Sequence, residues 1–287
     1  MEPVRTLIDL QGASPGPSLP DELRILYGGD LRFPAFSGER PYVVGNFVST
    51  LDGVISFKVP GQSGGGTISG SDEADRFIMG LLRASVDAVV VGAGTVHEVS
   101  PTHLWIAESI YPETKDLYAG YRRTALRKAG NPLLVIVSGS GRLELGRAIF
   151  HTPGTRVLIV TTESGKHQLA SIGANALDST EVAALADAGG WIDPSAILAL
   201  LRDKSGVRIV LHEGGATLFG HFMAHGLVDE VFLTLAPQIA GRTTERPRPG
   251  MVAAVEFPPE TAPWFHLVSA KQRGGHLYLR YQVKSGT

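Results

Sequence analysis

Two segments of the chain place glycines directly after an apolar run and directly before a helical pattern. One reads D-A-V-V-V-G-A-G-T-V over residues 87–96, and the other reads R-I-V-L-H-E-G-G-A-T-L-F-G over residues 208–220. Glycine lets a large ligand approach the backbone closely, and the first amide groups of a helix have no partner inside the helix. Because the helix dipole also favours negative charge there, each turn could bind a phosphate group. For each turn, a tight strand–helix connection without a ligand stays open.

Other phosphate and metal sites lack the residues they need. The first turn has G-x-G at Gly92 and Gly94, but His97 stands where a Rossmann fingerprint has its third glycine, and no acidic residue ends a second strand about 20 residues later. No P-loop sequence is present. His221 and His225 are four residues apart, which is a spacing for metal ligands, yet no glutamate follows His221 and no metal site is expected.

Two further polar segments follow predicted strands. The first, N-F-V-S-T-L-D-G over residues 46–53, precedes the glycine-rich segment 61–69, and the pair would suit a substrate side with a lid. A solvated turn explains the same residues equally well. The second is S-G-S-G-R over residues 138–142, where hydroxyls and an arginine could bind a phosphate monoester such as the 2′-phosphate of NADPH. A simple loop is again an alternative.

Alternating strands and helices must position these segments. The pattern predicts strands over residues 42–48, 87–91, 133–137, 157–160, 207–212 and 230–235, and helices over residues 73–84, 194–203 and 216–225. Short, wholly apolar strands are typical of parallel sheets that are covered on both faces. Two alternating runs around Gly274 and Gly275, residues 265–271 and 276–283, predict an antiparallel closing hairpin. The expected fold is α/β, with a mixed, mostly parallel sheet and helices on both faces.

Composition limits the classes of function. The 287 residues are 43% hydrophobic and carry a formal net charge of −2, so a binder of nucleic acid by charge neutralisation is not expected. No apolar run approaches the roughly 18–20 residues that a membrane span requires. Cysteine is absent, which removes disulfides and thiolate zinc sites and predicts a cytoplasmic protein.

The chain is expected to consist of an N-terminal arm, residues 1–40, and one domain, residues 41–287. Three prolines make residues 12–20 unsuited to a helix or a central strand, and a short helix is expected over residues 21–27. The first helix of the domain has Ser71 or Asp72 available as its N-cap.

Segments 46–53, 68–96 and 211–241, taken together and in this order, resemble the reductase domain of the bacterial riboflavin-biosynthesis deaminase–reductase. The resemblance covers about residues 41–285 and implies the dihydrofolate reductase-like fold. It also implies the activity: hydride passes from the nicotinamide of NADPH to the C1′ imine of a phosphoribosylamino-pyrimidine, so that ribose becomes ribitol. Members of the family commonly form homodimers, and a homodimer is expected here.

The resemblance assigns roles to individual residues. The residues expected to bind NADPH are Gly92, Ala93, Gly94, Thr95, Ser138, Arg142, Glu213, Gly214, Gly215, Ala216, Thr217 and Leu218. Within this set Ser138 and Arg142 would meet the 2′-phosphate. Asn46, Ser49 and Asp52 would line the substrate side, with Asp52 orienting the substrate or relaying its proton; Glu213 is the second choice for that task.

The sequence departs from the family after the first glycine turn. The family usually reads D-P-x-L-x-x-R there, the arginine serving the substrate phosphate, whereas residues 99–106 read V-S-P-T-H-L-W-I. His103, Arg122 or Arg123 could substitute, and a long loop is expected over residues 106–130. The zinc deaminase half of the bifunctional enzyme is not expected, since its cysteines are missing. A reductase of dihydrofolate or another heterocycle, and a nucleotide-binding module without catalysis, remain alternatives.

Overall fold

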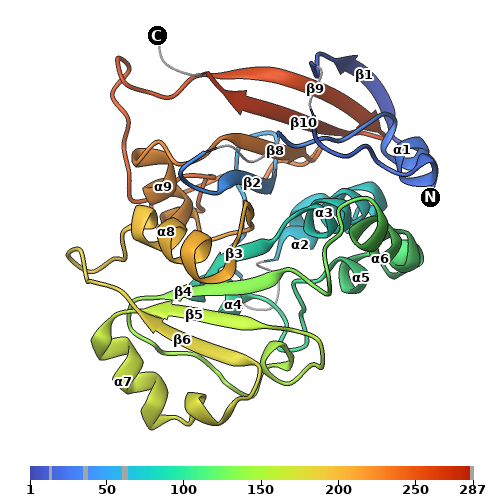
Figure 1. Ribbon diagram of the computed structural model, residues 1–287. Coiled ribbons are helices and arrows are strands. Elements are labelled where there is room, and N and C mark those ends of the chain that lie inside the picture. The colour runs from blue at the N-terminus through green and yellow to red at the C-terminus, as the bar shows by residue number, and fades with distance from the viewer. Residues whose placement is uncertain (13–14, 35–37, 60–63, 285–287) are drawn as a thin grey trace.

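The computed structural model describes residues 1–12, 15–34, 38–59 and 64–284. Within them a ten-stranded sheet runs through the molecule, with helices packed on its faces (Figure 1). The strands are β1 Arg5–Asp9, β2 Tyr42–Ser49, β3 Ala88–Gly92, β4 Leu133–Ser138, β5 Val157–Thr161, β6 Thr180–Ala184, β7 Ile209–His212, β8 Glu230–Leu235, β9 Phe265–Arg273 and β10 His276–Val283. Their order across the sheet is β1-β9-β10-β8-β2-β7-β3-β4-β5-β6.

The helices predicted over residues 73–84, 194–203 and 216–225 are present as α3, α8 and α9. The α-helices are α1 Asp21–Tyr27, α2 Gly65–Ser69, α3 Glu73–Ser85, α4 Ala93–Glu98, α5 Ala107–Ile110, α6 Lys115–Thr124, α7 Glu163–Ser171, α8 Pro194–Ser205 and α9 Ala216–Ala224. Helix α3 begins as expected, since the Asp72 side chain accepts a hydrogen bond from the Asp75 amide at 2.8 Å. None of the helices in the described residues is both long and apolar enough to cross a membrane.

The sheet is parallel on one side and antiparallel on the other. Strands β8, β2, β7, β3, β4, β5 and β6 pair in parallel, whereas β8, β10, β9 and β1 pair antiparallel. Gly274 turns the closing hairpin with a φ of 55°, a conformation that favours glycine. The predicted mixed, mostly parallel sheet with a C-terminal hairpin is therefore confirmed.

Two hydrophobic cores lie on opposite faces of the sheet. Val89 of β3 packs with Leu81 of α3 and other residues of one core, while Val90 packs with Phe219 of α9 and others of the second core. Successive residues of a strand point to opposite faces, so a strand between two cores must be apolar throughout. This covering of both faces explains the continuous apolar runs in the sequence.

The first 40 residues include a strand of the sheet. β1 pairs antiparallel with β9, so that segment 5–9 forms one edge of the sheet. The ammonium group of Lys271 on β9 is buried and donates to Thr6 Oγ1 at 2.8 Å and to the Gly28 carbonyl at 2.9 Å. The predicted helix over residues 21–27 is confirmed as α1, and its Leu23 is fully buried.

The long loop expected over residues 106–130 is wrong. This segment contains α5, a 3₁₀ turn at Pro112–Thr114 and α6. Helix α6 buries aromatic and charged side chains, and Tyr118 donates to the Phe77 carbonyl at 2.8 Å. Because that buried face is built from tyrosines and an arginine, aliphatic spacing does not reveal it.

Candidate functional site

A cavity of about 880 Å³ opens where several parallel strands end. Its walls come from β2, from the turns after β3 and β7, from α2, and from segments 98–105 and 190–192. Ligands of open α/β sheets bind at the carboxyl ends of the strands, and this cavity occupies that position. Of the glycine-rich segment 61–69, residues 61–63 lie outside the described residues, while Gly64, Gly65 and Gly66 line the cavity.

The two glycine turns lie side by side. β3 and β7 are neighbours in the sheet, and the Gly92 amide donates to the Gly214 carbonyl at 3.4 Å. A Cβ atom on Gly214 would lie 2.9 Å from Thr95 Oγ1, and one on Gly215 would lie 3.7 Å from the Cα of Gly92. Both glycines have positive φ, 134° and 85°. The two strand ends thus present bare backbone to the cavity, as a bulky anionic ligand requires.

Most of the residues expected to bind NADPH line this cavity. They are Gly92, Gly94, Thr95, Glu213, Gly214, Gly215, Ala216, Thr217 and Leu218. Helices α4 and α9 begin at the two turns, so their first amide groups face this region. Ala93 belongs to the same turn but is not among the lining residues. A cofactor diphosphate fits the fold here, because Gly92, Gly94, Gly214 and Gly215 leave the backbone of both turns uncovered at the cavity wall.

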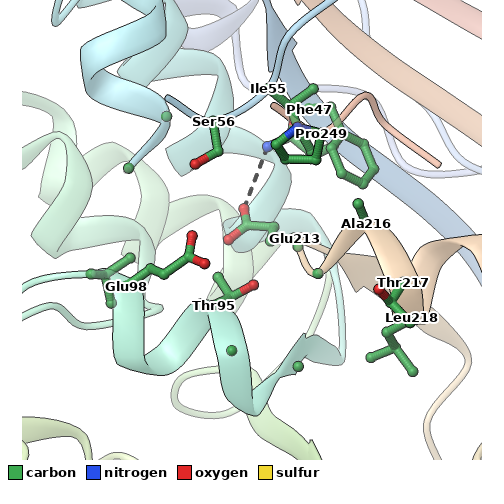
Figure 2. A pocket seen from close by; sticks show the side chains of 18 of the residues that line it. Phe47, Ile55, Ser56, Thr95, Glu98, Glu213, Ala216, Thr217, Leu218 and Pro249 are labelled. Carbon is green, nitrogen blue, oxygen red and sulfur yellow. Dashed lines mark hydrogen bonds between the residues drawn. The ribbon is translucent and has the colours of Figure 1, made fainter. Parts of the chain in front are cut away.

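The carboxylate of Glu213 stands in the middle of the cavity wall (Figure 2). Arg83 donates to it from Nη2 at 2.8 Å and from Nε at 3.0 Å, and both side chains are buried. Asn46 approaches the same carboxylate with its Nδ2 atom, 3.5 Å from Oε1. Thr95 and Glu98 of α4 lie nearby in Figure 2, with Ser56 on the opposite side. The side chain of a glutamate, an amide and several hydroxyls therefore surround one part of the cavity.

Asn46 lines the cavity, but Ser49 and Asp52 do not. Ser49 is buried and donates to the Thr50 carbonyl at 3.2 Å. Asp52 accepts from the amides of Ala240 at 3.1 Å and Gly241 at 2.8 Å, and its side chain lies at the surface. The Thr50 hydroxyl together with these amides lowers the pKa of Asp52 to about 2. The structure places its carboxylate in a loop contact and does not bring it to the cavity.

The two residues expected at the 2′-phosphate also lie outside the lining. Ser138 is buried in β4, and its carbonyl accepts from Thr161 Oγ1 at 2.6 Å. The next residue, Gly139, does line the cavity. Arg142 is exposed. In the hydrogen bonds that the structure shows for it, Arg142 takes part with its backbone carbonyl and amide, to His97 and Ser140 respectively. Residues 138–142 therefore border the cavity through Gly139.

The segment that departs from the family contributes His103. This side chain lines the cavity and packs edge-on against Trp105, with ring centroids 4.5 Å apart. Burial and the nearby charge of Arg83 lower the pKa of His103 to about 3, so its imidazole is neutral near pH 7. Arg122 cannot serve a substrate phosphate, because its guanidinium donates to the carbonyls of Ala84 and Val86, both at 2.8 Å.

Several lining residues were not predicted from sequence. Asp75 is fully buried, and burial raises its pKa to about 6. Lys58 pairs with Glu98 at the cavity wall. Trp191 stacks on His221 with ring centroids 4.4 Å apart and an angle of 6° between the planes. Helical spacing could have placed Asp75 on the inner face of α3, but no local signal marks the other contacts.

His221 therefore has an aromatic partner. His225 lies close to the same tryptophan ring, at 5.2 Å between centroids. In the part of the chain that the structure describes, no group of three histidine or carboxylate side chains could hold a metal ion.

Most of the domain that follows the N-terminal arm is similar to known proteins. Residues 41–272 match the model of the family described as RibD C-terminal domain. The chain belongs to this family. A relative from Archaeoglobus fulgidus, named 2,5-diamino-6-ribosylamino-4(3H)-pyrimidinone 5′-phosphate reductase, is 30% identical over 202 residues, which cover 70% of this chain and 83% of the relative. A protein of the same name from Methanothermobacter thermautotrophicus is 28% identical over 70% of this chain and 80% of its own length. The expected membership in a reductase family of the riboflavin pathway is confirmed.

Solved structures share the fold with this RibD-family chain. A pyrimidine reductase-like protein from Corynebacterium diphtheriae is 20% identical, with a TM-score of 0.64 over 86% of this chain and 93% of that chain. A diaminohydroxyphosphoribosylaminopyrimidine deaminase/5-amino-6-(5-phosphoribosylamino)uracil reductase from Thermotoga maritima is 23% identical, with a TM-score of 0.59 over 86% of this chain. The present chain spans 57% of that longer protein.

Proposed function

We propose that this protein is an NADPH-dependent reductase that converts the ribosylamino group of a phosphoribosylamino-pyrimidine into a ribitylamino group. The observation that carries the proposal is the adjacent pair of glycine turns, which offer only backbone at one edge of a cavity with polar walls. The names of the archaeal relatives, which are reductases of a ribosylamino-pyrimidinone 5′-phosphate, support the substrate class.

When bound, NADPH supplies the hydride. The turns after β3 and β7 would hold its diphosphate with backbone amides, and the N-terminus of α9 would add a favourable dipole. Thr95 and Thr217 offer hydroxyl groups in the first turns of α4 and α9. These residues would hold the cofactor in the same cavity as Glu213, so that cofactor and substrate could be oriented together.

The substrate side is formed by Glu213, Asn46 and Asp75. Arg83 holds the Glu213 carboxylate in place, and this acceptor suits the amino and ring N–H groups of a diaminopyrimidine. Hydride at C1′ and a proton at the imine nitrogen together convert the imine into an amine. Asp75 is the lining carboxyl best suited to hold that proton, because burial raises its pKa to about 6. Asp52 is outside this set, since its carboxylate fastens the loop at Ala240 and Gly241.

The preference for NADPH over NADH is assigned to segment 138–142. Gly139 reaches the cavity wall, and the exposed Arg142 follows three residues later with its guanidinium open to an anion. A gain in melting temperature with NADPH that is larger than the gain with NADH would support this assignment. In Arg142→Gln the preference for NADPH should fall by roughly tenfold, since a charge-assisted contact is lost. If Arg142→Gln preferred NADPH over NADH as strongly as the wild type does, the assignment of segment 138–142 would be contradicted.

The activity is tested by following the absorbance of NADPH at 340 nm with two substrates. Loss of absorbance with the phosphoribosylamino-pyrimidine and not with dihydrofolate is the expected result. The reverse result would identify a pterin reductase. No loss with either substrate, despite NADPH binding, would identify a nucleotide-binding module without catalysis, which the changed segment 99–106 makes worth testing.

We further infer a homodimer in the cytoplasm. The free edge of β1 supports a two-fold contact, because Leu7 and Ile8 are 45% and 43% exposed there. Light scattering tests the dimer: a mass close to 30.5 kDa would contradict it. The cytoplasmic location rests on the absence of cysteine.

A further inference from the structure

The side-chain charges around Glu213, away from the backbone amides of the two glycine turns, do not suit the phosphate monoester of the substrate. Lys58 and Arg83 are the cations among its described lining residues, and both are paired, with Glu98 and Glu213 respectively. Asp75 adds a third carboxyl to the same wall. A phosphate monoester carries a charge of about −1.5 to −2 at pH 7 and would meet more acids than cations here.

A second, smaller cavity adjoins the first. Its volume is about 540 Å³, and it lies between segments 57–59 and 245–248. Lys58 lines both cavities, so the two spaces meet at this side chain. The two segments are joined next to the shared wall, where the Ile55 amide donates to the Pro249 carbonyl at 3.0 Å.

The charge in the second cavity has the opposite sign. Its described lining contains the cations Arg246 and Arg248, the Lys58 ammonium that also pairs with Glu98, and one acid, Glu245. The Arg248 guanidinium lies 4.8 Å from the centre of the Phe57 ring and donates to the carbonyls of Ala240 and Gly241. These contacts hold one cation in a fixed position, whereas Nε of Arg248 is buried without a hydrogen-bond partner.

Arg246 differs from its two neighbours. Its side chain is exposed, and the hydrogen bonds that the structure shows for this residue come from its backbone. The guanidinium is therefore available to bind an anion with two parallel N–H donors, the geometry that suits a phosphate group.

We propose that the phosphate of the substrate is bound in this second cavity by Arg246, Arg248 and Lys58. The proposal rests on the proposed function and adds the position of the phosphate end. The heterocycle occupies the main cavity beside Glu213, and the sugar chain passes Lys58 into the smaller space. This position removes the need for an arginine in segment 99–106, where the sequence has none.

The test compares Arg246→Gln with Arg123→Gln, an equal loss of charge at an exposed residue of α6 away from both cavities. The KM is measured for the phosphoribosylamino-pyrimidine and for its dephosphorylated form. Arg246→Gln is expected to reduce the preference for the phosphorylated form by roughly tenfold, and Arg246→Glu by more. Arg123→Gln should keep the wild-type preference. An unchanged preference in Arg246→Gln would overturn the proposal.

A binding measurement separates this proposal from the proposed function. Ribose 5-phosphate is titrated by calorimetry into the protein saturated with NADP⁺, which blocks the phosphate sites of the cofactor. Binding that weakens in Arg246→Gln and not in Arg123→Gln supports the site even if the wild type reduces neither pyrimidine. The absence of binding to the wild type, or equal binding to all three proteins, would overturn it.

Discussion

Arg83 connects the turn after β7 with the segment that departs from the family. Its Nη2 and Nε atoms bind the carboxylate of Glu213, while its Nη1 donates to the Leu104 carbonyl at 3.0 Å. The side chains of the pair are 2% and 4% exposed. Two buried charges that satisfy each other are costly to separate, so the position of Glu213 in the cavity depends on Arg83.

Removing one partner of this pair should destabilise the protein strongly. Arg83→Met leaves the Glu213 carboxylate buried without its cation, which is expected to cost about 3–5 kcal/mol of the free energy of unfolding. The double variant Arg83→Met/Glu213→Leu should recover much of that loss, because no unpaired charge remains. Urea denaturation measures both. A loss in the single variant below about 1 kcal/mol, as for an exposed pair, would contradict the buried role.

A methyl group on Gly214 should separate the two glycine turns. The residue has a φ of 134°, and the added Cβ would lie 2.9 Å from Thr95 Oγ1. Gly214→Ala is expected to cost about 1–3 kcal/mol of stability and to weaken NADPH binding, measured by fluorescence titration. Gly120→Ala is the matched control, since a Cβ there meets nothing within 4 Å and alanine favours the helix. Unchanged NADPH affinity in Gly214→Ala would remove this turn from the cofactor site.

Asp75 should make the protein less stable as the pH rises. The pKa of Asp75 is about 6 in the folded protein, against 3.8 for an unperturbed aspartate. The unfolded chain therefore loses this proton first, and the free energy of unfolding falls between about pH 4 and pH 6. Asp75→Asn lacks this titration, so its stability relative to wild type should rise over that range by up to about 3 kcal/mol. Urea denaturation across pH 4 to 8 measures the free energy of unfolding of both proteins. If the difference between Asp75→Asn and wild type did not change with pH, the raised pKa of Asp75 would be contradicted.

Replacing Asp52 should loosen the loop after β8 before it affects the cofactor. In Asp52→Asn the acceptors of the Ala240 and Gly241 amides are weaker, because a carboxylate is replaced by a neutral amide. Hydrogen exchange of peptides that cover residues 236–248 should accelerate, while the Kd for NADPH stays near the wild-type value. Since Asp52 has a lowered pKa, the protection of these amides relative to their intrinsic exchange rate should also fall in wild type as the pH drops from 4 toward 2. Slow exchange of these amides in the variant would contradict the contact.

The central strands could be predicted because both of their faces are covered. β3 and β4 are buried along almost their whole length and apolar up to Gly92 and Ser138, whereas the edge strands β1 and β6 are partly exposed and were missed. An edge strand needs neither a continuous apolar run nor a strict alternation, so its sequence reads as a loop. Each of these edge strands forms because its backbone pairs with a strand elsewhere in the sequence. Its own five residues contain no pattern that predicts this pairing.

The two glycine turns of the site could be predicted from the sequence. Of the side chains that line the cavity, only some could be predicted. Glycines after apolar runs indicate where a ligand can approach, and both turns lie on the cavity. Asp52 was expected on the substrate side, but its partners Ala240 and Gly241 are almost 190 residues away in the chain. His103 reaches the wall only because α3 and segment 99–106 fold together through Arg83. Such contacts depend on tertiary structure, which local spacing does not encode.

The buried Lys271 ammonium has a consequence for truncated proteins. Its acceptors, Thr6 and the Gly28 carbonyl, and the Tyr27 ring at 4.4 Å all precede residue 41, where the family match begins. A shortened expression clone starting at residue 41 would lose the groups that surround this cation and would uncover the edge of β9. Such a product should aggregate on purification, so the unit that folds is longer than the unit by which relatives are recognised.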